Sequence, residues 1–428
     1  MIIKSIPSRK ALSRRLARSA VAVALETILV ISLSLKLIPA AAELLVPDAV
    51  PVPISYFGMH FMHTAQGTRL PPRGIGSWRL WDAAVNWRYL DPKGAGLNFA
   101  PLDKLVSLAR SKHIEVLYTF GATPEWASAR PKEKGPYGQG SAAEPLNLSD
   151  WSDFVRRTAR RYRGSIPYYE IWNEPNAGFF TGPTKVFVEM GCAASAILRQ
   201  TDPTVRIVGP GGQSTDPHWL NDFFDAGGGN CVDVISWHFY TLRGKPEDML
   251  PIIRNVQIIM RKHGYQDKPL WNTESGWRLD LGPSHAPPIE ATLPKLDQEH
   301  SAAYVARSLI LGWAAGLRRS YHYAWDHNDM GFIREDGTLT AAAQAFVTVQ
   351  TWMEGAVLRS CDRTDGTWQC ELEKDGARST IAWREDGPAT QWIAPPGFTT
   401  IDTLDAVHDT VAGGRQVTLG ILPIRLAN

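Results

Sequence analysis

The sequence lacks the motifs that mark several large classes of enzyme and binding protein. None of its strand-like runs leads into a G-x-G-x-x-G motif or a phosphate-binding P-loop, which argues against a doubly wound nucleotide-binding sheet. No C-x-x-C pair or Cys/His cluster is present, and His60 and His63 form only an isolated H-x-x-H. Internal repeats and low-complexity tracts are also missing after the first 42 residues. The sequence therefore predicts neither a nucleotide cofactor nor a metal site.

Excess charge of one sign is also scarce outside the N-terminal segment. The 428 residues carry a formal net charge of +2. The first 42 residues contain seven Lys or Arg and one Glu, a sum of +6, so the remainder carries 2 − 6 = −4. Proteins that bind nucleic acids usually present a basic face. We therefore do not expect nucleic acid to be a partner.

The basic start precedes an apolar segment with no long uncharged run. The stretch "AVAVALETILVISLSLKLIPAAAE" ends in the small residues Ala40 to Ala42, which is typical of a secretory signal. Glu26 and Lys36 leave only Thr27 to Leu35 free of charge, whereas a membrane-spanning helix needs roughly 20 apolar residues. Residues 1–42 are expected to be a signal peptide or an N-terminal membrane anchor, with a cytosolic amphipathic helix as the third alternative. The first two predict an exported protein, periplasmic or secreted, or attached to the inner membrane.

Only four cysteines are present, and export makes them candidates for disulfide bonds. Cys361 and Cys370 bracket "DRTDGTWQ", which is typical of a hairpin loop and favours a local bridge. Cys192 and Cys231 would then form the second pair. Four cysteines allow three pairings, and the sequence does not decide among them.

Eight strand-like runs alternate with segments of helical period and predict an α/β fold. The helical segment "DKLVSLARSKH", for example, places Leu105, Val106, Leu108 and Ala109 on one face. Eight strands alternating with helices favour a (β/α)₈ TIM barrel, typically about 250 residues long, over an open doubly wound sheet. We place the catalytic barrel domain at residues 43–354. The strand-like runs cover residues 56–61, 77–82, 114–121, 168–173, 205–212, 232–240, 269–276 and 320–326.

From residue 355 the pattern changes to apolar and polar residues in alternation. Turn sequences "TDG", "KDG" and "EDG" separate these short runs. Residues 355–428 are therefore predicted to form a small C-terminal antiparallel β-sandwich domain. The segment around residues 44–53 could add a strand to it.

Two glutamates end predicted strands on opposite walls of the barrel mouth. Working residues of (β/α)₈ barrels lie at the carboxyl ends of the strands, and Glu174 and Glu274 end the fourth and seventh. Paired carboxylates across a cleft are what glycosidic cleavage requires, and this chemistry needs no metal or organic cofactor. Glu174, beside Trp172, fits a proton donor. Arg79 and a tyrosine hydroxyl could keep Glu274 ionised as a nucleophile.

Other side chains near the strand ends are candidates for binding substrate. Asn173 is placed to reach a sugar 2-hydroxyl, and three tryptophans could offer flat faces to pyranose rings: Trp126, Trp277 and Trp325. An interior ion pair is the alternative for Arg79, and packing at the barrel top is the alternative for His238 and Tyr240. Glu125 and Asp82 are further acids that could displace the assignment of the catalytic pair.

The run "IWNEPN", followed by "WNTESGW", resembles the acid/base and nucleophile motifs of clan A glycoside hydrolases. The runs "RLWD", "TPEWAS", "WHFY" and "YHYAWD" narrow the likeness to glycoside hydrolase family 39 and its bacterial exopolysaccharide-associated relatives. The resemblance implies a retaining mechanism through a covalent glycosyl-enzyme, with Glu174 as acid/base and Glu274 as nucleophile. It also assigns supporting positions to Arg79, Asn173, His238, Tyr240 and Trp325. The loops "ARPKEKGPYGQGSAAEP" and "DLGPSHAPPIEATLPKLD" match no substrate pattern, so no particular sugar is predicted.

The sequence as a whole predicts an exported, retaining β-glycosidase that acts on a polysaccharide or an oligosaccharide. A carbohydrate-binding protein on a glycosidase scaffold, without turnover, is the alternative from a different functional class. A transglycosylase, in which a sugar replaces water as the acceptor, is the alternative within the enzymes. The sequence predicts no oligomeric state.

Overall fold

The computed structural model describes the whole chain except residues 1–42, 65–66, 68–69, 72–73, 282–291 and 411–414. The predicted leader at residues 1–42 lies outside the described residues. Among the residues that are described, no helix is long and apolar enough to cross a bilayer.

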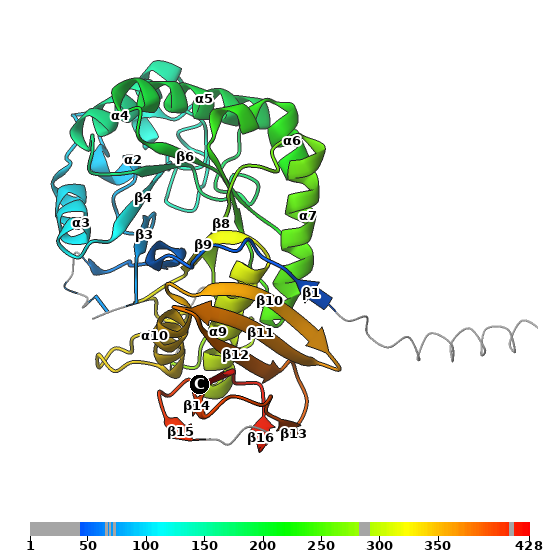
Figure 1. Cartoon of the computed structure of the whole chain (residues 1–428). Coiled ribbons are helices and arrows are strands. Elements are labelled where there is room, and N and C mark those ends of the chain that lie inside the picture. The colour runs from blue at the N-terminus through cyan, green and yellow to red at the C-terminus, as the bar shows by residue number, and fades with distance from the viewer. Residues whose placement is uncertain (1–42, 65–66, 68–69, 72–73, 282–291, 411–414) are drawn as a thin grey trace, which may run out of the picture.

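Eight parallel strands close into a barrel, which confirms the predicted fold (Figure 1). Most of their residues are buried, and Phe57–His60 and Leu270–Ser275 are buried throughout. Such continuous burial is typical of parallel strands that are covered on both faces. The strands are β2 (Phe57–His60), β3 (Ser77–Leu80), β4 (Glu115–Phe120), β5 (Tyr168–Ile171), β6 (Arg206–Gln213), β7 (Val234–His238), β8 (Leu270–Ser275) and β9 (Leu317–His322).

The last barrel strand differs from its prediction in position. It begins three residues before the expected start and ends at His322, so Tyr323 to Asp326 lie beyond it. The backbone N–H of Trp325 donates to the backbone oxygen of His60, at the end of β2, over 2.9 Å. Residues after His322 therefore form part of the barrel rim rather than of the sheet.

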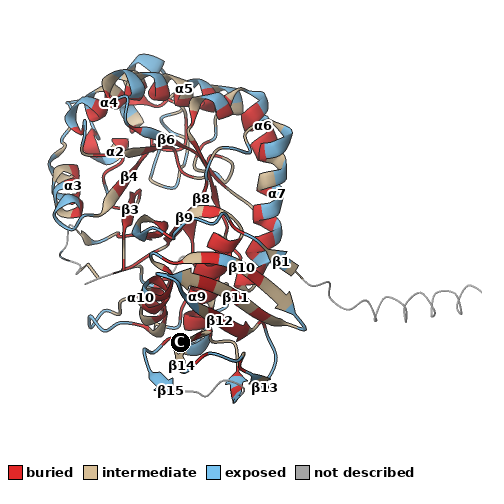
Figure 2. Ribbon diagram, viewed as in Figure 1, coloured by how far each residue is buried: buried red, intermediate tan, exposed pale blue. Residues whose placement is uncertain are grey.

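Helices surround the barrel and turn their apolar faces towards the strands (Figure 2). Both α7 and α9 are followed by a glycine with positive φ, Gly264 at 77° and Gly316 at 95°, a conformation that glycine adopts without steric cost. The described helices are α2 (Trp87–Leu90), α3 (Ala100–Ser111), α4 (Leu148–Arg161), α5 (Thr184–Thr201), α6 (Trp219–Asp225), α7 (Met249–Lys262), α9 (Gln298–Ala314) and α10 (Ala341–Met353). Short 3-10 segments are η1 (Ile54–Tyr56), η3 (Glu125–Ala127), η4 (Gly228–Cys231) and η5 (Pro246–Asp248).

The C-terminal residues form a separate antiparallel domain, as predicted. A seven-stranded sheet has the order β1-β10-β11-β12-β17-β14-β15, and β13 pairs with β16 in a two-stranded ribbon. Its first strand is β1 (Glu43–Leu45), so the start of the segment around residues 44–53 does add a strand to this domain. The remaining strands are β10 (Val357–Thr364), β11 (Thr367–Lys374), β12 (Ala377–Arg384), β13 (Thr390–Ile393), β14 (Thr400–Asp402), β15 (His408–Thr410), β16 (Gln416–Leu419) and β17 (Ile424–Ala427).

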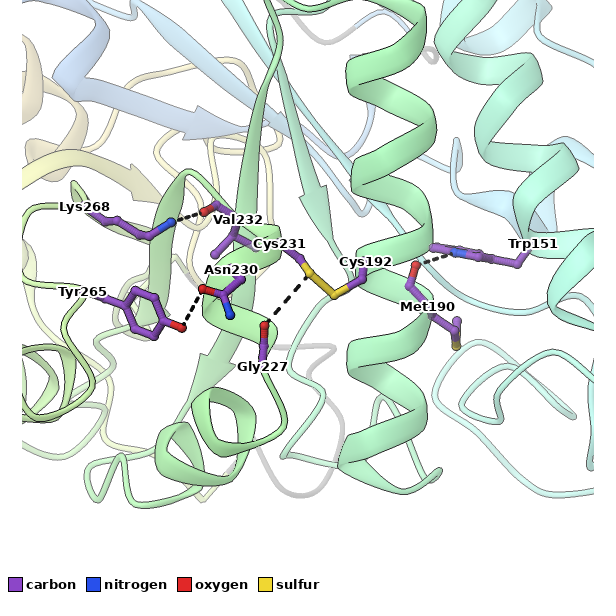
Figure 3. The surroundings of a disulfide bond; sticks show 9 residues. All are labelled: Trp151, Met190, Cys192, Gly227, Asn230, Cys231, Val232, Tyr265 and Lys268. Carbon is purple, nitrogen blue, oxygen red and sulfur yellow. Dashed lines mark hydrogen bonds between the residues drawn. A yellow bond between two sulfur atoms is a disulfide. The ribbon is translucent and has the colours of Figure 1, made fainter.

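Two disulfide bonds are present, one between segments that are distant in sequence and one between adjacent strands. Cys192 of α5 is bonded to Cys231 of η4, across 39 residues of sequence (Figure 3). Cys361 and Cys370 are cross-strand partners in β10 and β11 and form the second bridge. This is the pairing that the hairpin around Cys361 and Cys370 favoured. Helix α9 contacts both β9 of the barrel and β10, and so links the two domains.

Candidate active site

Glu174 lies in a tight turn immediately after β5. Trp172 and Glu174 have positive φ angles of 70° and 43°, a left-handed conformation that is uncommon for residues other than glycine. The Glu174 N–H donates to the backbone oxygen of Gly211 at 2.8 Å, which fixes the turn against β6. Such conformations cost on the order of 1–3 kcal/mol each and cluster at functional sites. The turn directs the Glu174 carboxyl group over the barrel mouth.

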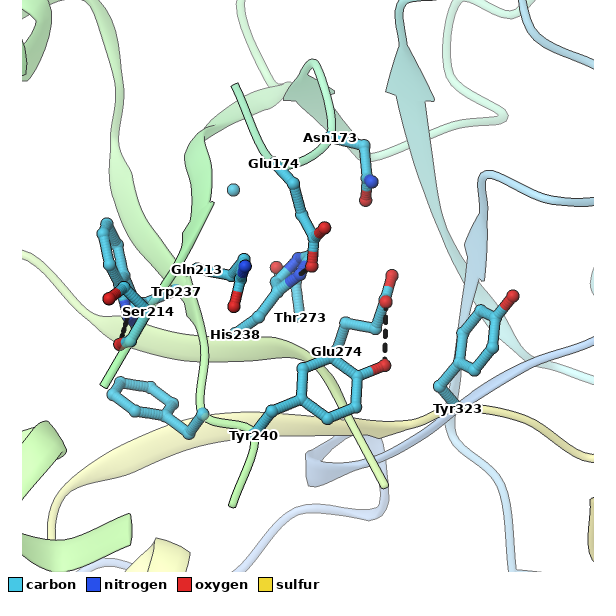
Figure 4. A network of polar contacts seen from close by, with 12 residues as sticks. Asn173, Glu174, Gln213, Ser214, Trp237, His238, Tyr240, Thr273, Glu274 and Tyr323 are labelled. Carbon is cyan, nitrogen blue, oxygen red and sulfur yellow. Dashed lines mark hydrogen bonds and ion pairs between the residues drawn. The ribbon is translucent and has the colours of Figure 1, made fainter. Parts of the chain in front are cut away.

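Glu274 is the penultimate residue of β8, on another wall of the barrel, and its carboxyl group accepts two hydrogen bonds. Arg79 Nη1 donates to Oε2 at 2.8 Å, and the Tyr240 hydroxyl donates to Oε1 at 2.8 Å. In Figure 4 the carboxyl groups of Glu174 and Glu274 extend into one space from different strands. Each oxygen of Glu274 therefore has a donor that stabilises its charge.

Arg79 of β3 connects the barrel interior to this site. Its side chain is fully buried, and Nε donates to Glu170 Oε2 at 2.6 Å. Nη2 donates to Asn173 Oδ1 at 2.7 Å, in addition to the bond from Nη1 to Glu274. Thr119 also donates to Glu170, at 2.9 Å. One guanidinium therefore forms the interior ion pair with Glu170 and also contacts Glu274 and Asn173.

The two central carboxyl groups are close together. One oxygen of Glu174, one oxygen of Glu274 and one ring nitrogen of His238 all lie within 4.8 Å of one another. Glycosidases that retain configuration have carboxyl groups about 5–5.5 Å apart, and inverting ones about 6.5–9.5 Å. The observed separation lies nearer to the range of the retaining enzymes than to that of the inverting ones.

Burial raises the pKa of both glutamates. It raises the pKa of Glu174 to about 7, opposed by Arg79 and assisted by the charge of Asp82. It also raises the pKa of Glu274 to about 7, against the lowering effects of His238 and Arg79. The two groups share a small space, so one proton held between them relieves their repulsion. Arg79 and Tyr240 donate directly to Glu274, and these hydrogen bonds favour the charged form of Glu274 over that of Glu174.

His238 adjoins Glu174 as a neutral side chain. Its Nδ1 lies 2.9 Å from Glu174 Oε1, and burial lowers the pKa of His238 to about 4. A neutral imidazole can donate to a carboxylate or accept from a carboxylic acid, depending on its tautomer. This contact is therefore compatible with both protonation states of Glu174.

Three further side chains form a polar cluster at the same mouth. Asp82, just after β3, accepts hydrogen bonds from the hydroxyl groups of Tyr137 and Tyr323, the latter at 2.9 Å. Burial and the charge of Asp82 hold the pKa of both tyrosines well above their usual value, so both remain donors. Asp82 is thus a third acid of the site. The sequence analysis named Asp82 as a candidate. It did not name Tyr137, which lies in a loop that has no periodic hydrophobic pattern.

The structure leaves one of the three tryptophan predictions open and contradicts the other two. Trp126 is 42% exposed, and its Nε1 donates to the backbone oxygen of Asp91. Trp277 and Trp325 are buried, so the prediction that they offer open faces to a sugar is wrong. Trp277 packs edge-on against Tyr304. Trp325 lies among Phe61 and Phe332. Both follow strand ends, but the turn after each strand directs the ring into the core.

Two other candidates from the sequence lie outside the central network. Glu125 forms an ion pair with Lys132, at 2.5 Å. In the H-x-x-H pair, His60 Nε2 lies against the backbone oxygen of Thr273, and the backbone N–H of His63 donates to Asp326. The two histidines therefore do not form a shared site. Within the described part of the chain, the group close enough to hold a metal ion is Glu174, His238 and Glu274 itself.

Residues 76–330 match the sequence profile of Glycosyl hydrolases family 39, over more than half of the chain. Among solved structures, the chain resembles a family 39 glycoside hydrolase from the gut symbiont Bacteroides cellulosilyticus WH2. That similarity has 17% identity and a TM-score of 0.68, over 83% of this chain and 75% of the other. A monomeric beta-xylosidase from Caulobacter crescentus CB15 is similar at 15% identity and a TM-score of 0.63, over 90% and 97% of the two chains.

A GH30 endoxylanase from Clostridium papyrosolvens C71 shares 13% identity, with a TM-score of 0.60, over 90% of this chain and 99% of its own. At these identities, the similarity to each solved structure shows a shared fold. No curated protein sequence matches the chain.

Proposed function

The chain belongs to family 39 of the glycosyl hydrolases and is a glycoside hydrolase, and we propose that it is a retaining β-glycosidase. In this proposal Glu174 is the acid/base and Glu274 is the nucleophile. The observation that carries it is the separation of their oxygens, within 4.8 Å. A retaining mechanism needs the nucleophile to reach the anomeric carbon directly, without an intervening water.

The first step of the mechanism divides the work between the two carboxyl groups. Glu274 attacks the anomeric carbon and forms a covalent glycosyl-enzyme, while Glu174 donates its proton to the departing glycosidic oxygen. Arg79 and Tyr240 support the charge on Glu274 before attack. In the second step Glu174, now a carboxylate, takes a proton from water as that water attacks the same carbon, and Glu274 departs.

In this proposal Asn173 assists at the 2-hydroxyl of the sugar. Arg79 Nη2 is a donor only, so the Asn173 atom that it contacts, at 2.7 Å, must be Oδ1. The amide nitrogen is then free to donate to substrate. A hydrogen bond to the 2-hydroxyl strengthens in the oxocarbenium-like transition state and favours turnover over ground-state binding.

The substrate class is proposed to be a polysaccharide or an oligosaccharide, and the enzyme is proposed to be exported. The two disulfides support export, because such bonds persist in oxidising compartments. The xylosidase and the endoxylanase mentioned above act, as their names state, on xylose-containing substrates, and xylosides therefore belong in a first substrate panel. The choice between periplasmic, secreted and membrane-attached protein depends on the leader at residues 1–42.

A panel of aryl β-glycosides tests the proposal against its alternatives. Wild type should release the aryl group, and Glu274→Ala should abolish release while the protein remains folded. The anomeric configuration of the first-formed sugar, followed by NMR, should be that of the substrate. Full activity in Glu274→Ala would overturn the assignment. Binding of glycans with no turnover by wild type would favour a carbohydrate-binding protein, and sugar-elongated products would identify a transglycosylase.

A further inference from the structure

The loop that follows Tyr240 is held by hydrogen bonds to its backbone. Trp277 Nε1 donates to the carbonyl oxygens of Thr241, at 3.1 Å, and Gly244, at 3.2 Å. The Trp277 indole is buried and packs against Tyr304 of α9 with ring centroids 5.5 Å apart. Trp277 therefore fixes the backbone directly after the tyrosine that contacts Glu274.

Farther along this loop, Lys245 reaches the C-terminal domain. Its Nζ lies 2.6 Å from Glu385 Oε1 and 2.6 Å from Asp386 Oδ2, just after β12. The side chain of Glu385 is 9% exposed, so this part of the contact is shielded from solvent. Ion pairs of this kind are screened less than those between fully exposed side chains.

Glu247, two residues after Lys245, is a buried carboxylate shared by both domains. Arg307 Nε of α9 donates to its Oε1 at 2.9 Å, and Trp383 Nε1 of β12 donates to the same oxygen at 3.2 Å. Arg307 also donates to the backbone oxygen of Glu385 at 3.0 Å. Removing one partner of a buried ion pair leaves an uncompensated charge, so this arrangement strongly resists displacement of the loop.

We propose that the C-terminal domain positions Tyr240, and thereby its hydrogen bond to Glu274, by holding the loop of residues 241–248. The inference rests on the proposed function, because it takes Glu274 to be the nucleophile. Lys245, Glu247 and Trp383 are then positioning residues, since their polar contacts cross the domain boundary and none of them is made with Glu174 or Glu274. The C-terminal domain is on this account a support of the active site rather than a separate sugar-binding module.

A purely structural interface would affect stability without changing the ionisation of Glu274. Tyr240 favours the charged form of Glu274, so displacing its hydroxyl raises the pKa of Glu274. The acid limb of kcat/KM, which reports ionisation of the nucleophile, then moves to higher pH. The other groups that act on Glu274 keep their identity in every variant used below: Arg79, Glu174, His238, Asp82, Tyr137 and Tyr323.

Trp383→Phe in the full chain is the test, and Trp368→Phe is its matched control. Both tryptophans are fully buried cross-strand partners whose rings stack at 5.9 Å. Trp383 donates to Glu247, whereas Trp368 Nε1 has no hydrogen-bond partner among the described residues. Both variants lose similar packing. We expect only Trp383→Phe to lower kcat/KM several-fold and to move the acid limb upward, by on the order of 0.5 pH unit.

Lys245→Met is a second variant, and it leaves the hydrophobic core intact. Double-mutant cycles that combine each variant with Tyr240→Phe show whether the change in the pH profile passes through Tyr240. If the loop acts through Tyr240, Trp383→Phe and Lys245→Met should add little to the change already produced by Tyr240→Phe. Equal acid limbs in Trp383→Phe, Lys245→Met, Trp368→Phe and wild type would overturn the inference. If Tyr240→Phe itself leaves the acid limb unchanged, the role proposed for Glu274 fails instead.

Discussion

Arg79 and Glu170 form a fully buried ion pair inside the barrel, with Nε 2.6 Å from Oε2, and the same guanidinium also contacts Glu274. The interior carboxylate thus orients the cation that supports the proposed nucleophile. Three nitrogen atoms of Arg79 are used by three different acceptors. Only a planar guanidinium offers donors in this fixed arrangement.

Arg79→Lys should therefore be a severe change although it keeps the positive charge. A lysine ammonium is a single point of charge and cannot reach Glu170, Asn173 and Glu274 together. We expect kcat/KM to fall by at least about 100-fold, as for loss of one preorganised donor in other active sites. The acid limb of the pH profile should move upward, because Glu274 loses a cationic donor. A profile and rate close to those of wild type would contradict this role.

The pH dependence of kcat/KM should be narrow and centred near neutrality. Glu274 must be ionised, so activity falls as pH drops below its pKa of about 7. Glu174 must be protonated, so activity falls as pH rises above its pKa of about 7. Because the groups interact, the two limbs report apparent values of the pair. In Glu174→Gln the alkaline limb should disappear for substrates with good leaving groups; its persistence would assign that limb to another residue.

The barrel and the two glutamates could be predicted because both depend on local patterns. Strands that are buried on both faces are continuously apolar, and polar residues directly after them lie at the rim. Glu170 could not be predicted in the same way, although a lone acid within the apolar run Tyr168 to Ile171 was a signal. Tyr137 offered no signal, since its position depends on the path of a long irregular loop.

The tryptophans show the limit of reasoning from strand ends. Trp277 and Trp325 follow β8 and β9 within a few residues, as a sugar platform would. The direction of each ring is set by backbone turns and tertiary contacts that the sequence does not specify. The indole N–H of Trp277, for example, donates to the backbone carbonyl oxygens of Thr241 and Gly244 in a different loop. Residue type and proximity alone therefore do not distinguish a binding surface from a structural support.

Glu174→Gln should stabilise the protein at alkaline pH. The pKa of Glu174 is raised on folding, from 4.5 to about 7, so its contribution to stability is fully present below pH 4.5 and is lost as pH rises through 7. The penalty at pH 8 is about 3 kcal/mol. Thermal unfolding should show a higher Tm than wild type at pH 8 and little difference at pH 4.5. The control Glu125→Gln alters a partly exposed glutamate paired with Lys132 and should show no such gain. Equal Tm values for Glu174→Gln and wild type at pH 8 would refute the burial argument.

The Cys192–Cys231 bridge should contribute more to stability than the Cys361–Cys370 bridge. The first spans 39 residues of sequence and the second spans nine. In the chain-entropy account, the longer loop stabilises by about 4 kcal/mol and the shorter by about 2.5 kcal/mol. The double variants Cys192→Ser/Cys231→Ser and Cys361→Ser/Cys370→Ser are compared by denaturant unfolding. We expect the larger loss of unfolding free energy in the first, with kcat/KM at 25 °C little changed because neither bridge contacts the glutamates. The reverse order would show that strain or packing at these cysteines outweighs loop closure.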